Sequence, residues 1–258
     1  MSRAPTSSVA PHYVLVTRGL LLVFAGLALW WGTIVLPEFW QQSSAERVAK
    51  RIIAGDPFKP ETLSLPLLAV TSSENHALCR PMALQSAAII QLRITETAPG
   101  GIVSSNKQLD PLGAAIRNSL SCAPANPFLW LVLYAVQNAK YGFRPEDLHY
   151  LRMSYTLGPD EGWILEKRNP VAISQLELLP PDLSAKAIDE FMRLLKDRFY
   201  ERAVETFCST TASRRDVILA KMTTVPLALR KAFARSAYDC GLDVEVPGVK
   251  STAPKRPW

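Results

Sequence analysis

The sequence IRNSLSCAP at Ile116–Pro124 returns in altered form as LRMSYTLGP at Leu151–Pro159, 35 residues further along the chain. An aliphatic residue, Arg, Ser, a small residue and Pro recur in register. Between the two copies lies a dense apolar run, Phe128–Val136, which Gly142 follows. A period in the mid-thirties with Pro at the end of each unit is typical of repeats built from helix pairs. The block 116–168 is therefore predicted to form the centre of a helical domain.

Composition and charge place the chain among ordinary globular proteins. It has 258 residues, 48% of them hydrophobic, and its 29 basic and 23 acidic residues give a formal net charge of +6. These charges are dispersed, without the clustered basic patch that marks nucleic-acid-binding proteins. We therefore predict no nucleic-acid partner. The 20 Pro residues indicate many short helices with abrupt ends.

The N-terminal region carries a candidate membrane segment. Residues 19–36 read GLLLVFAGLALWWGTIVL, without a charge, close to the ~20 residues needed to cross the hydrocarbon core. Trp30, Trp31 and Trp40 gather at its far end, as an interfacial aromatic belt does. The alternatives are a buried helix of a soluble protein and a cleaved signal peptide, whose apolar core is roughly 7–15 residues long. We predict an uncleaved transmembrane helix at 19–36 after a short tail, 1–18, with the lipid bilayer as its partner.

The charges that flank this segment do not decide its orientation. Arg3 and Arg18 precede it, and Arg47, Lys50 and Arg51 follow it, so the positive-inside rule gives no clear direction. A short tail before a lone N-terminal anchor favours a cytoplasmic N-terminus and an exported domain. In a bacterium the chain would then be a single-pass inner-membrane protein with its main domain in the periplasm.

Residues 37–66 are expected to hold a juxtamembrane helix and a linker. The capping box Ser43-x-x-Glu46 would open the helix, and Gly55 would end it. Three Pro residues in 56–66 indicate an extended linker.

A helical domain is predicted at 67–180. Its first helix would cover 73–97, with Pro81 either as a kink or as the true start, and Asp110-Pro111 would open the next helix. Further boundaries are indicated by start signals at Asn126-Pro127, Pro145 and Asp160 and by end signals at Gly142 and Gly158-Pro159.

The last third is predicted to be a three-helix segment, 181–243, followed by a disordered tail, 244–258. Strand-like patterning is limited to short pieces such as Leu242–Val246. The chain is therefore predicted to be all-α, with a C-terminal helical bundle. The three helices are expected at 183–207, 216–222 and 226–240.

Four cysteines, Cys79, Cys122, Cys208 and Cys240, occur without a Cys-x-x-Cys pair or a His at ligand spacing. A zinc site is therefore not expected. The cysteines are either free and buried or joined in two disulfides, depending on the compartment. Hairpin geometry would bring Cys79 near Cys122 and Cys208 near Cys240, which makes these the candidate disulfides.

The 116–168 block resembles the tetratricopeptide repeat. Trp130, Leu133, Pro159 and Trp163 match the large, small and Pro positions of that family, whereas Tyr134 stands where the family has a small residue. The resemblance covers about two units and implies antiparallel helix pairs with a protein-binding surface, but no chemistry. The layout of anchor, repeat and basic tail also looks similar to membrane-anchored helical proteins of bacterial envelopes, some associated with surface-polysaccharide assembly.

No catalytic, cofactor or metal motif is recognisable, and the three histidines lack ligand partners at suitable spacing. One hypothesis is that Arg117 and Arg152 line one groove and hold an acidic ligand, such as a partner's carboxylate or an anionic glycan, since Arg suits bidentate contacts of that kind. The alternative is structural, with Arg stems covering apolar helix surface. The candidate partner groove comprises Arg117, Ser119, Trp130, Tyr134, Arg152, Ser154 and Trp163.

Together these patterns favour a membrane-anchored, non-enzymatic interaction or scaffold protein with no cofactor and a protein partner at the membrane. The second hypothesis is an envelope enzyme, or an accessory subunit of one, whose site carries no recognisable motif.

Overall fold

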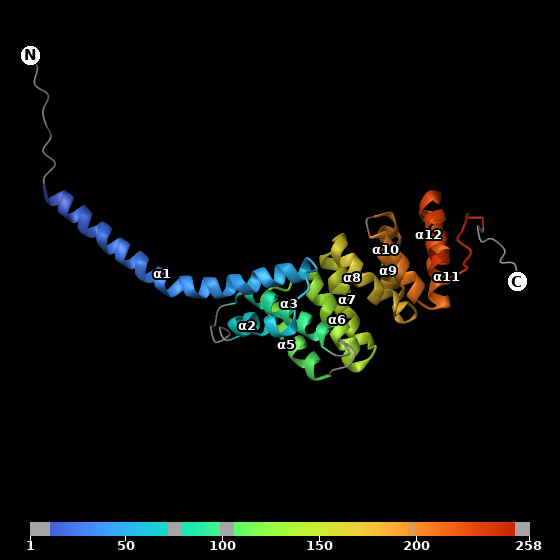
Figure 1. Ribbon diagram of the computed structural model, residues 1–258, viewed down its shortest axis with the longest axis horizontal. Helices are drawn as coiled ribbons and strands as arrows, with labels where there is room; N and C mark the ends of the chain where they lie inside the picture. Colours follow the sequence, from blue (N-terminus) through green and yellow to red (C-terminus); the bar gives the residue numbers. More distant parts are fainter. Residues whose placement is uncertain (1–10, 72–78, 99–105, 198, 251–258) are drawn as a thin grey trace, which may run out of the picture. The chain divides into compact units, whose positions relative to one another are not determined.

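The computed structural model describes residues 11–71, 79–98, 106–197 and 199–250, and their regular secondary structure is all helical, with no β-strand among them (Figure 1). The all-α prediction is confirmed in this sense. The chain divides into two compact units, unit 1 (Met1–Cys122) and unit 2 (Ala123–Trp258). The boundary falls inside the predicted domain 67–180, near the end of the first copy of the repeated sequence. Residues Ile116–Cys122 of that copy belong to unit 1, whereas the whole second copy lies in unit 2.

One long helix, α1 (Pro11–Ile53), begins unit 1. Its segment Tyr13–Ile34 is long and apolar enough to cross a membrane, and none of it is buried. The helix then continues without a break to Ile53, so the predicted new start at Ser43 is wrong. Because a continuing helix supplies its own backbone acceptors, the N–H groups near Ser43 need no capping side chain. Further along, Ala45 and Ala49 are buried.

The linker predicted at 56–66 is instead largely helical. Helix α2 (Pro60–Thr71) begins with Pro at a position where no backbone N–H is needed, and Glu61 lies in its first turn. Leu63 is fully buried in a small core with Ala45 of α1. Burial of this leucine favours the helix despite Pro66 in its interior, which removes one hydrogen bond.

Two further helices complete the described part of unit 1. Helix α3 (Pro81–Thr97) starts at Pro81, and α5 (Asn106–Cys122) packs against it. The predicted start of α5 at Asp110-Pro111 is wrong, because Leu109 belongs to the same buried stripe as Leu112 and extends the helix by a turn. The predicted segment 73–78 and the Gly100-Gly101 break lie outside the described residues.

Unit 2 begins with a helix hairpin. Helix α6 (Pro127–Tyr141) is capped by Asn126, whose side chain accepts a hydrogen bond from the Leu129 N–H at 3.1 Å. It ends at Gly142, whose φ of 75° is the left-handed region that glycine adopts freely. A short turn leads to α7 (Leu148–Leu157), which packs on α6 and ends at Gly158. These predicted boundaries are confirmed.

A second hairpin follows in α8 (Gly162–Ile173) and α9 (Pro181–Lys196). The single helix predicted at 183–207 is wrong, because α9 ends at Asp197 in extended backbone and α10 (Tyr200–Ser209) begins anew. Phe199 lies in the break with its ring against the start of α8, where a Cβ on Gly162 would come within 2.7 Å of it. The chain therefore turns here to pack Phe199, which a straight helix could not do. The predicted three-helix segment thus contains four helices.

The last two helices are α11 (Ala212–Lys221) and α12 (Leu227–Asp239). A non-helical segment, 242–250, then runs back along α12, and its Val246 is 3% exposed in the unit 2 core. The prediction of a disordered tail is therefore wrong for residues 244–250. The alternating sequence Leu-Asp-Val-Glu-Val places its valines towards the core. Residues 251–258 lie outside the described part of the chain.

Each unit contains one disulfide. In unit 1, Cys79 before α3 is joined to Cys122 at the end of α5, with their Cα atoms 5.6 Å apart. In unit 2, Cys208 of α10 is joined to Cys240 after α12, with a Cα–Cα distance of 6.4 Å. The crosslinks close loops of 43 and 32 residues, and loops of this length restrict the unfolded chain substantially.

The N-cap of α6 gives a direct test of the fold of unit 2. Replacing Asn126→Ala removes the acceptor for the Leu129 N–H and should lower the free energy of unfolding by about 1 kcal/mol. Urea unfolding of the full chain in detergent, followed by circular dichroism, measures this. Asn126→Ser keeps a capping oxygen and should lose much less; equal losses in both variants would contradict the assigned cap.

Candidate functional site

Arg152, proposed from sequence as a clamp for an acidic partner, already contacts an acid of its own chain. Its guanidinium on α7 donates to both carboxylate oxygens of Asp182 at the start of α9, with Nη2–Oδ1 at 3.1 Å. These hydrogen bonds lower the pKa of Asp182 below its ordinary value. The bidentate geometry that suggested ligand capture therefore links two helices of unit 2.

Three other members of the predicted groove are buried. Tyr134 is fully buried, and its hydroxyl hydrogen-bonds the side chain of Gln175. Ser154 is also fully buried, and Ser119 in unit 1 is 1% exposed. Their packing makes them unavailable to a partner, which is a correction to the predicted groove. Arg117 is exposed on α5 in unit 1.

The two tryptophans of the groove lie in aromatic pairs on unit 2. Trp130 stacks on Tyr150 at a centroid distance of 5.9 Å, and its indole N–H donates to the Pro124 carbonyl at 2.7 Å. Trp163 is 38% exposed and packs against Phe128, with centroids 5.1 Å apart. Both therefore hold helix ends, although part of each ring faces solvent.

A charged cluster that the sequence reasoning missed lies at the centre of unit 2. Arg168 of α8 and Glu190 of α9 are both fully buried and form an ion pair, Nη2–Oε1 2.7 Å. The guanidinium also donates to the carbonyls of Ser154 and Gly158 on α7, at 2.7 and 3.1 Å. On the other side, the Tyr155 hydroxyl donates to Glu190 Oε2 at 3.1 Å. Arg168 thus connects the end of α7 with α8 and α9.

The electrostatics of this cluster are set by burial. Burial raises the pKa of Glu190 above its ordinary value, and the neighbouring Arg168 charge opposes this without cancelling it. Burial also raises the pKa of Tyr155 well above its ordinary value, and the Glu190 carboxylate adds to the increase. Tyr155 therefore stays protonated as a donor. With no access to solvent, the cluster is suited to holding helices together and not to acting on a substrate.

A pattern in the sequence could have identified this cluster. Arg168 lies on the same helical stripe as Ile164 and Ala172, and Glu190 lies on the stripe of Ala187 and Leu194. A charge on an apolar stripe must be buried, and a buried charge needs a partner of opposite sign. Two such charges on successive helices predict an ion pair.

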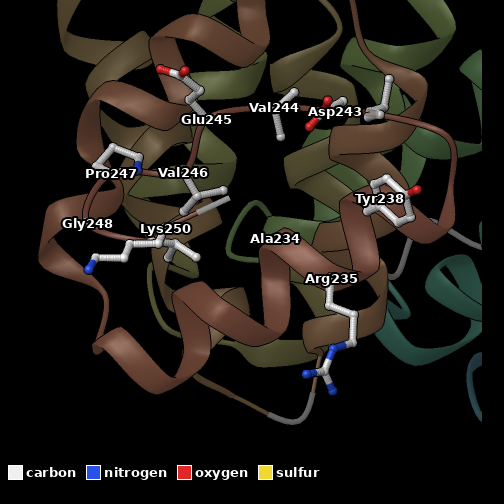
Figure 2. A pocket seen from close by; sticks show the side chains of 12 residues that line it. Ala234, Arg235, Tyr238, Asp243, Val244, Glu245, Val246, Pro247, Gly248 and Lys250 are labelled. Atoms are coloured by element: carbon white, nitrogen blue, oxygen red, sulfur yellow. The ribbon is translucent and has the colours of Figure 1, made fainter. Parts of the chain in front are cut away.

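A pocket of about 880 Å³ lies between α12 and the segment 242–250 (Figure 2). Its lining mixes apolar and charged side chains, and Figure 2 shows the two acids on one side of the opening and the two cations on the other. Such a rim suits a partner segment that carries both apolar and charged residues. The lining includes Ala234, Val244 and Val246, with Asp243, Glu245, Arg235 and Lys250 at the rim.

The segment that forms one wall of the pocket is fixed at several points. Gly241 follows the disulfide-bonded Cys240 with a φ of 86°, which allows the sharp exit from α12. Arg230 of α12 donates to the Pro247 carbonyl. Gly248, with a φ of 75°, passes so close to Arg230 that a Cβ would lie 2.8 Å from its Nη1. The pocket is therefore preformed.

The buried ion pair predicts a large, pH-dependent loss of stability on removing one partner. Arg168→Met leaves the Glu190 carboxylate without a counter-charge and should cost about 3–5 kcal/mol at pH 7. The folded state binds the Glu190 proton more tightly than the unfolded chain does. The contribution of this protonation to the free energy of unfolding is therefore fully present below about pH 4.3, the pKa of an unperturbed Glu, and is lost as pH rises through the folded-state pKa. Removing Arg168 raises that pKa further, so the deficit should be smaller at pH 4 than at pH 7 in urea unfolding of the full chain.

The matched control removes both charges. Arg168→Met combined with Glu190→Leu should recover much of the stability and flatten the pH dependence, since no buried charge remains. A deficit in Arg168→Met that is the same at both pH values would contradict a buried, ionised Glu190.

Comparisons with protein-family models, curated proteins and solved structures find no match for this chain. The likeness to the tetratricopeptide repeat therefore rests on the residues that suggested it, among them Trp130, Pro159 and Trp163. The structure adds that Trp130 and Trp163 occupy successive hairpins of unit 2 and that Pro159 follows the first. It is from the geometry of the two units that a function must be inferred.

Proposed function

We propose that the chain is a membrane-anchored helical scaffold whose disulfide-bonded units lie in an oxidising, extracytoplasmic compartment and bind a partner protein there. In a bacterial cell this compartment is the periplasm, with the N-terminus in the cytoplasm. The pairing of all four cysteines carries the proposal.

The disulfides support the compartment because such bonds persist in oxidising surroundings and are rare in reducing ones. Both join cysteines that are distant in sequence yet adjacent in the fold, with Cα separations of 5.6 and 6.4 Å. Both also tie helix ends together, as crosslinks that stabilise a small unit would. In a reducing cytoplasm such disulfides are rarely kept.

The apolar part of α1 supports the anchor. The segment Tyr13–Ile34 presents exposed leucines, valines and tryptophans on all sides, and none of it is buried by the chain itself. A helix that is apolar all round needs an apolar environment, which a bilayer supplies. Anchoring confines the units to one surface and raises their effective concentration towards partners in the same membrane.

The interaction role is supported by the preformed pocket beside α12 and by the two helix hairpins of unit 2, α6–α7 and α8–α9. Tetratricopeptide-like hairpins would make this a partner-binding surface, and a role in assembling an envelope complex, such as surface-polysaccharide machinery, is in keeping with this architecture. No observation favours the enzyme alternative, because Glu190, Tyr155 and Tyr134, whose pKa values in unit 2 are raised, are all buried in contacts between helices.

The compartment is tested by the state of the thiols. Membranes containing the full chain, quenched and denatured without reductant, should show no thiol that reacts with a polyethylene-glycol maleimide, and four after reduction, seen as stepwise mobility shifts. Cys79→Ser with Cys122→Ser should leave two reactive thiols after reduction. Four reactive thiols before reduction would place the units in a reducing compartment and overturn the proposal. A protease-protection assay of a reporter fused after Trp258 gives the orientation independently.

The binding role is tested by filling the pocket. Ala234→Trp places an indole in the pocket beside α12 and should weaken binding of a partner, isolated from solubilised membranes with the wild-type chain, by tenfold or more. Ala232→Trp makes the same change at an exposed position on the same helix and should bind like the wild type. Unchanged affinity in a folded Ala234→Trp variant would exclude this pocket as the binding site.

A further inference from the structure

Helix α2 exposes large apolar side chains on its outer face. Leu65 is 75% exposed and Leu68 60% exposed, while Leu63 on the inner face is fully buried. Between Thr62 and Thr71 the helix has no charged residue. A short helix that is apolar both inside and outside is unusual at a water-facing surface, since surface helices place polar residues outward.

The position of α2 along α1 follows from the hairpin that joins them. The connection between Ile53 and Pro60 is short, and α2 packs on α1 and runs back along it (Figure 1). Leu63 shares a buried cluster with Ala45. At about 1.5 Å per residue, Ala45 lies about 17 Å beyond Ile34, the end of the apolar segment, and Leu68 lies about 8 Å nearer to it than Leu63.

Measured along α1, this places Leu65 about 14 Å, Leu68 about 9 Å and the end of α2 about 5 Å from the end of the apolar segment. The headgroup region of a bilayer extends about 5–8 Å beyond the hydrocarbon core on each side. The end of α2 therefore comes to the level of the lipid headgroups on the side where α1 emerges. Leu68 lies at the outer edge of that layer, and Leu65 lies further from the bilayer. This step rests on the proposed membrane span of α1.

The charges of the hairpin are segregated in the same direction. The part of α1 nearest the apolar segment, residues 35–45, contains a single charge, Glu38, and the returning part of α2, 62–71, contains none. The charged residues cluster at the opposite end of the hairpin. They are Glu46, Arg47, Lys50, Arg51, Asp56, Lys59 and Glu61. An interfacial element has this distribution, because charges are costly near the hydrocarbon and favourable in water.

We infer that α2 is a second membrane-contact element, whose C-terminal end brings Leu68 against the headgroup layer of the leaflet from which α1 emerges. Two contacts at different points fix the tilt of unit 1 on the bilayer, whereas a single spanning helix leaves it free to swing. The partner of this surface is lipid, and the recognition is apolar contact at the level of the headgroups.

Photo-crosslinking to lipid tests the inference with the full chain in phospholipid nanodiscs. Separate variants carry p-benzoylphenylalanine in place of Leu22, Ile53, Leu65 or Leu68, and lipid adducts are measured by mass spectrometry after irradiation. Leu22 lies in the apolar segment of α1. Ile53, 46% exposed at the far end of α1, lies about 28 Å beyond Ile34 and is the matched control. The adduct yield at Leu68 should be at least tenfold that at Ile53, and the yield at Leu65, further from the bilayer along α2, should lie between them.

The outcomes separate the two proposals. Strong adducts at Leu22 with yields at Leu65 and Leu68 no higher than at Ile53 would overturn the membrane contact of α2 and leave the anchor intact. No adduct at Leu22 would overturn the anchor, and the inference with it. Two independent α2 positions guard against a variant that disturbs local folding, and formation of both disulfides in each variant confirms that the units have folded.

Discussion

The buried guanidinium of Arg168 is the contact on which unit 2 depends. Its hydrogen bonds join the carbonyls of Ser154 and Gly158 at the end of α7 to Glu190 in the middle of α9. The Ser154 carbonyl already accepts the Gly158 N–H, and Arg168 adds a second donor to it; the Gly158 carbonyl lies beyond the end of α7, and Arg168 supplies the donor that the ended helix cannot. The net contribution of such a pair to stability is small compared with an apolar substitute, but the loss of either partner is severe. The Arg168–Glu190 pair therefore selects one arrangement of α7, α8 and α9 and adds little to the free energy of unfolding of that arrangement.

The contacts of Arg168 also explain part of the repeated sequence. In the second copy, Ser154 and Gly158 are the groups that Arg168 contacts, which gives their pattern a structural cause. In the first copy, Leu133 stands 35 residues before Arg168, at the corresponding place in the sequence. The copies thus share their helix-ending residues but not the charged contact. A pattern of Arg, Ser, a small residue and Pro indicates the end of a helix. It does not indicate that the two helices pack in the same way.

Features that depend on residues close together in the sequence could be predicted, whereas features that depend on distant residues could not. The cap at Asn126 and the end at Gly142 depend on residues within one turn, and both were predictable. The start of α2, the break at Phe199 and the burial of Val246 each depend on a residue distant in sequence. The continuity of α1 was missed for a different reason: a capping box signals a helix start only when the preceding backbone is not already helical. Arg168 and Glu190 could have been paired by their positions on apolar stripes, but the groove residues could not have been sorted into buried and exposed without the packing.

The disulfide in unit 2 connects stability with binding. It holds Cys240 at the point where the chain leaves α12, and the Arg230–Pro247 contact holds the segment again seven residues later, so the wall of the pocket is fixed at both ends. Ordering a loop on binding costs about 1–2 kcal/mol per residue in backbone entropy, and a wall ordered in advance avoids most of that cost. In unit 1 the same logic applies to the α1–α2 hairpin: the disulfide fastens α3 to α5, and α3 in turn packs on both arms of that hairpin. Under the proposed function and the proposed lipid contact of α2, oxidation would rigidify both binding surfaces, and the compartment that forms the disulfides would be the one in which those surfaces bind.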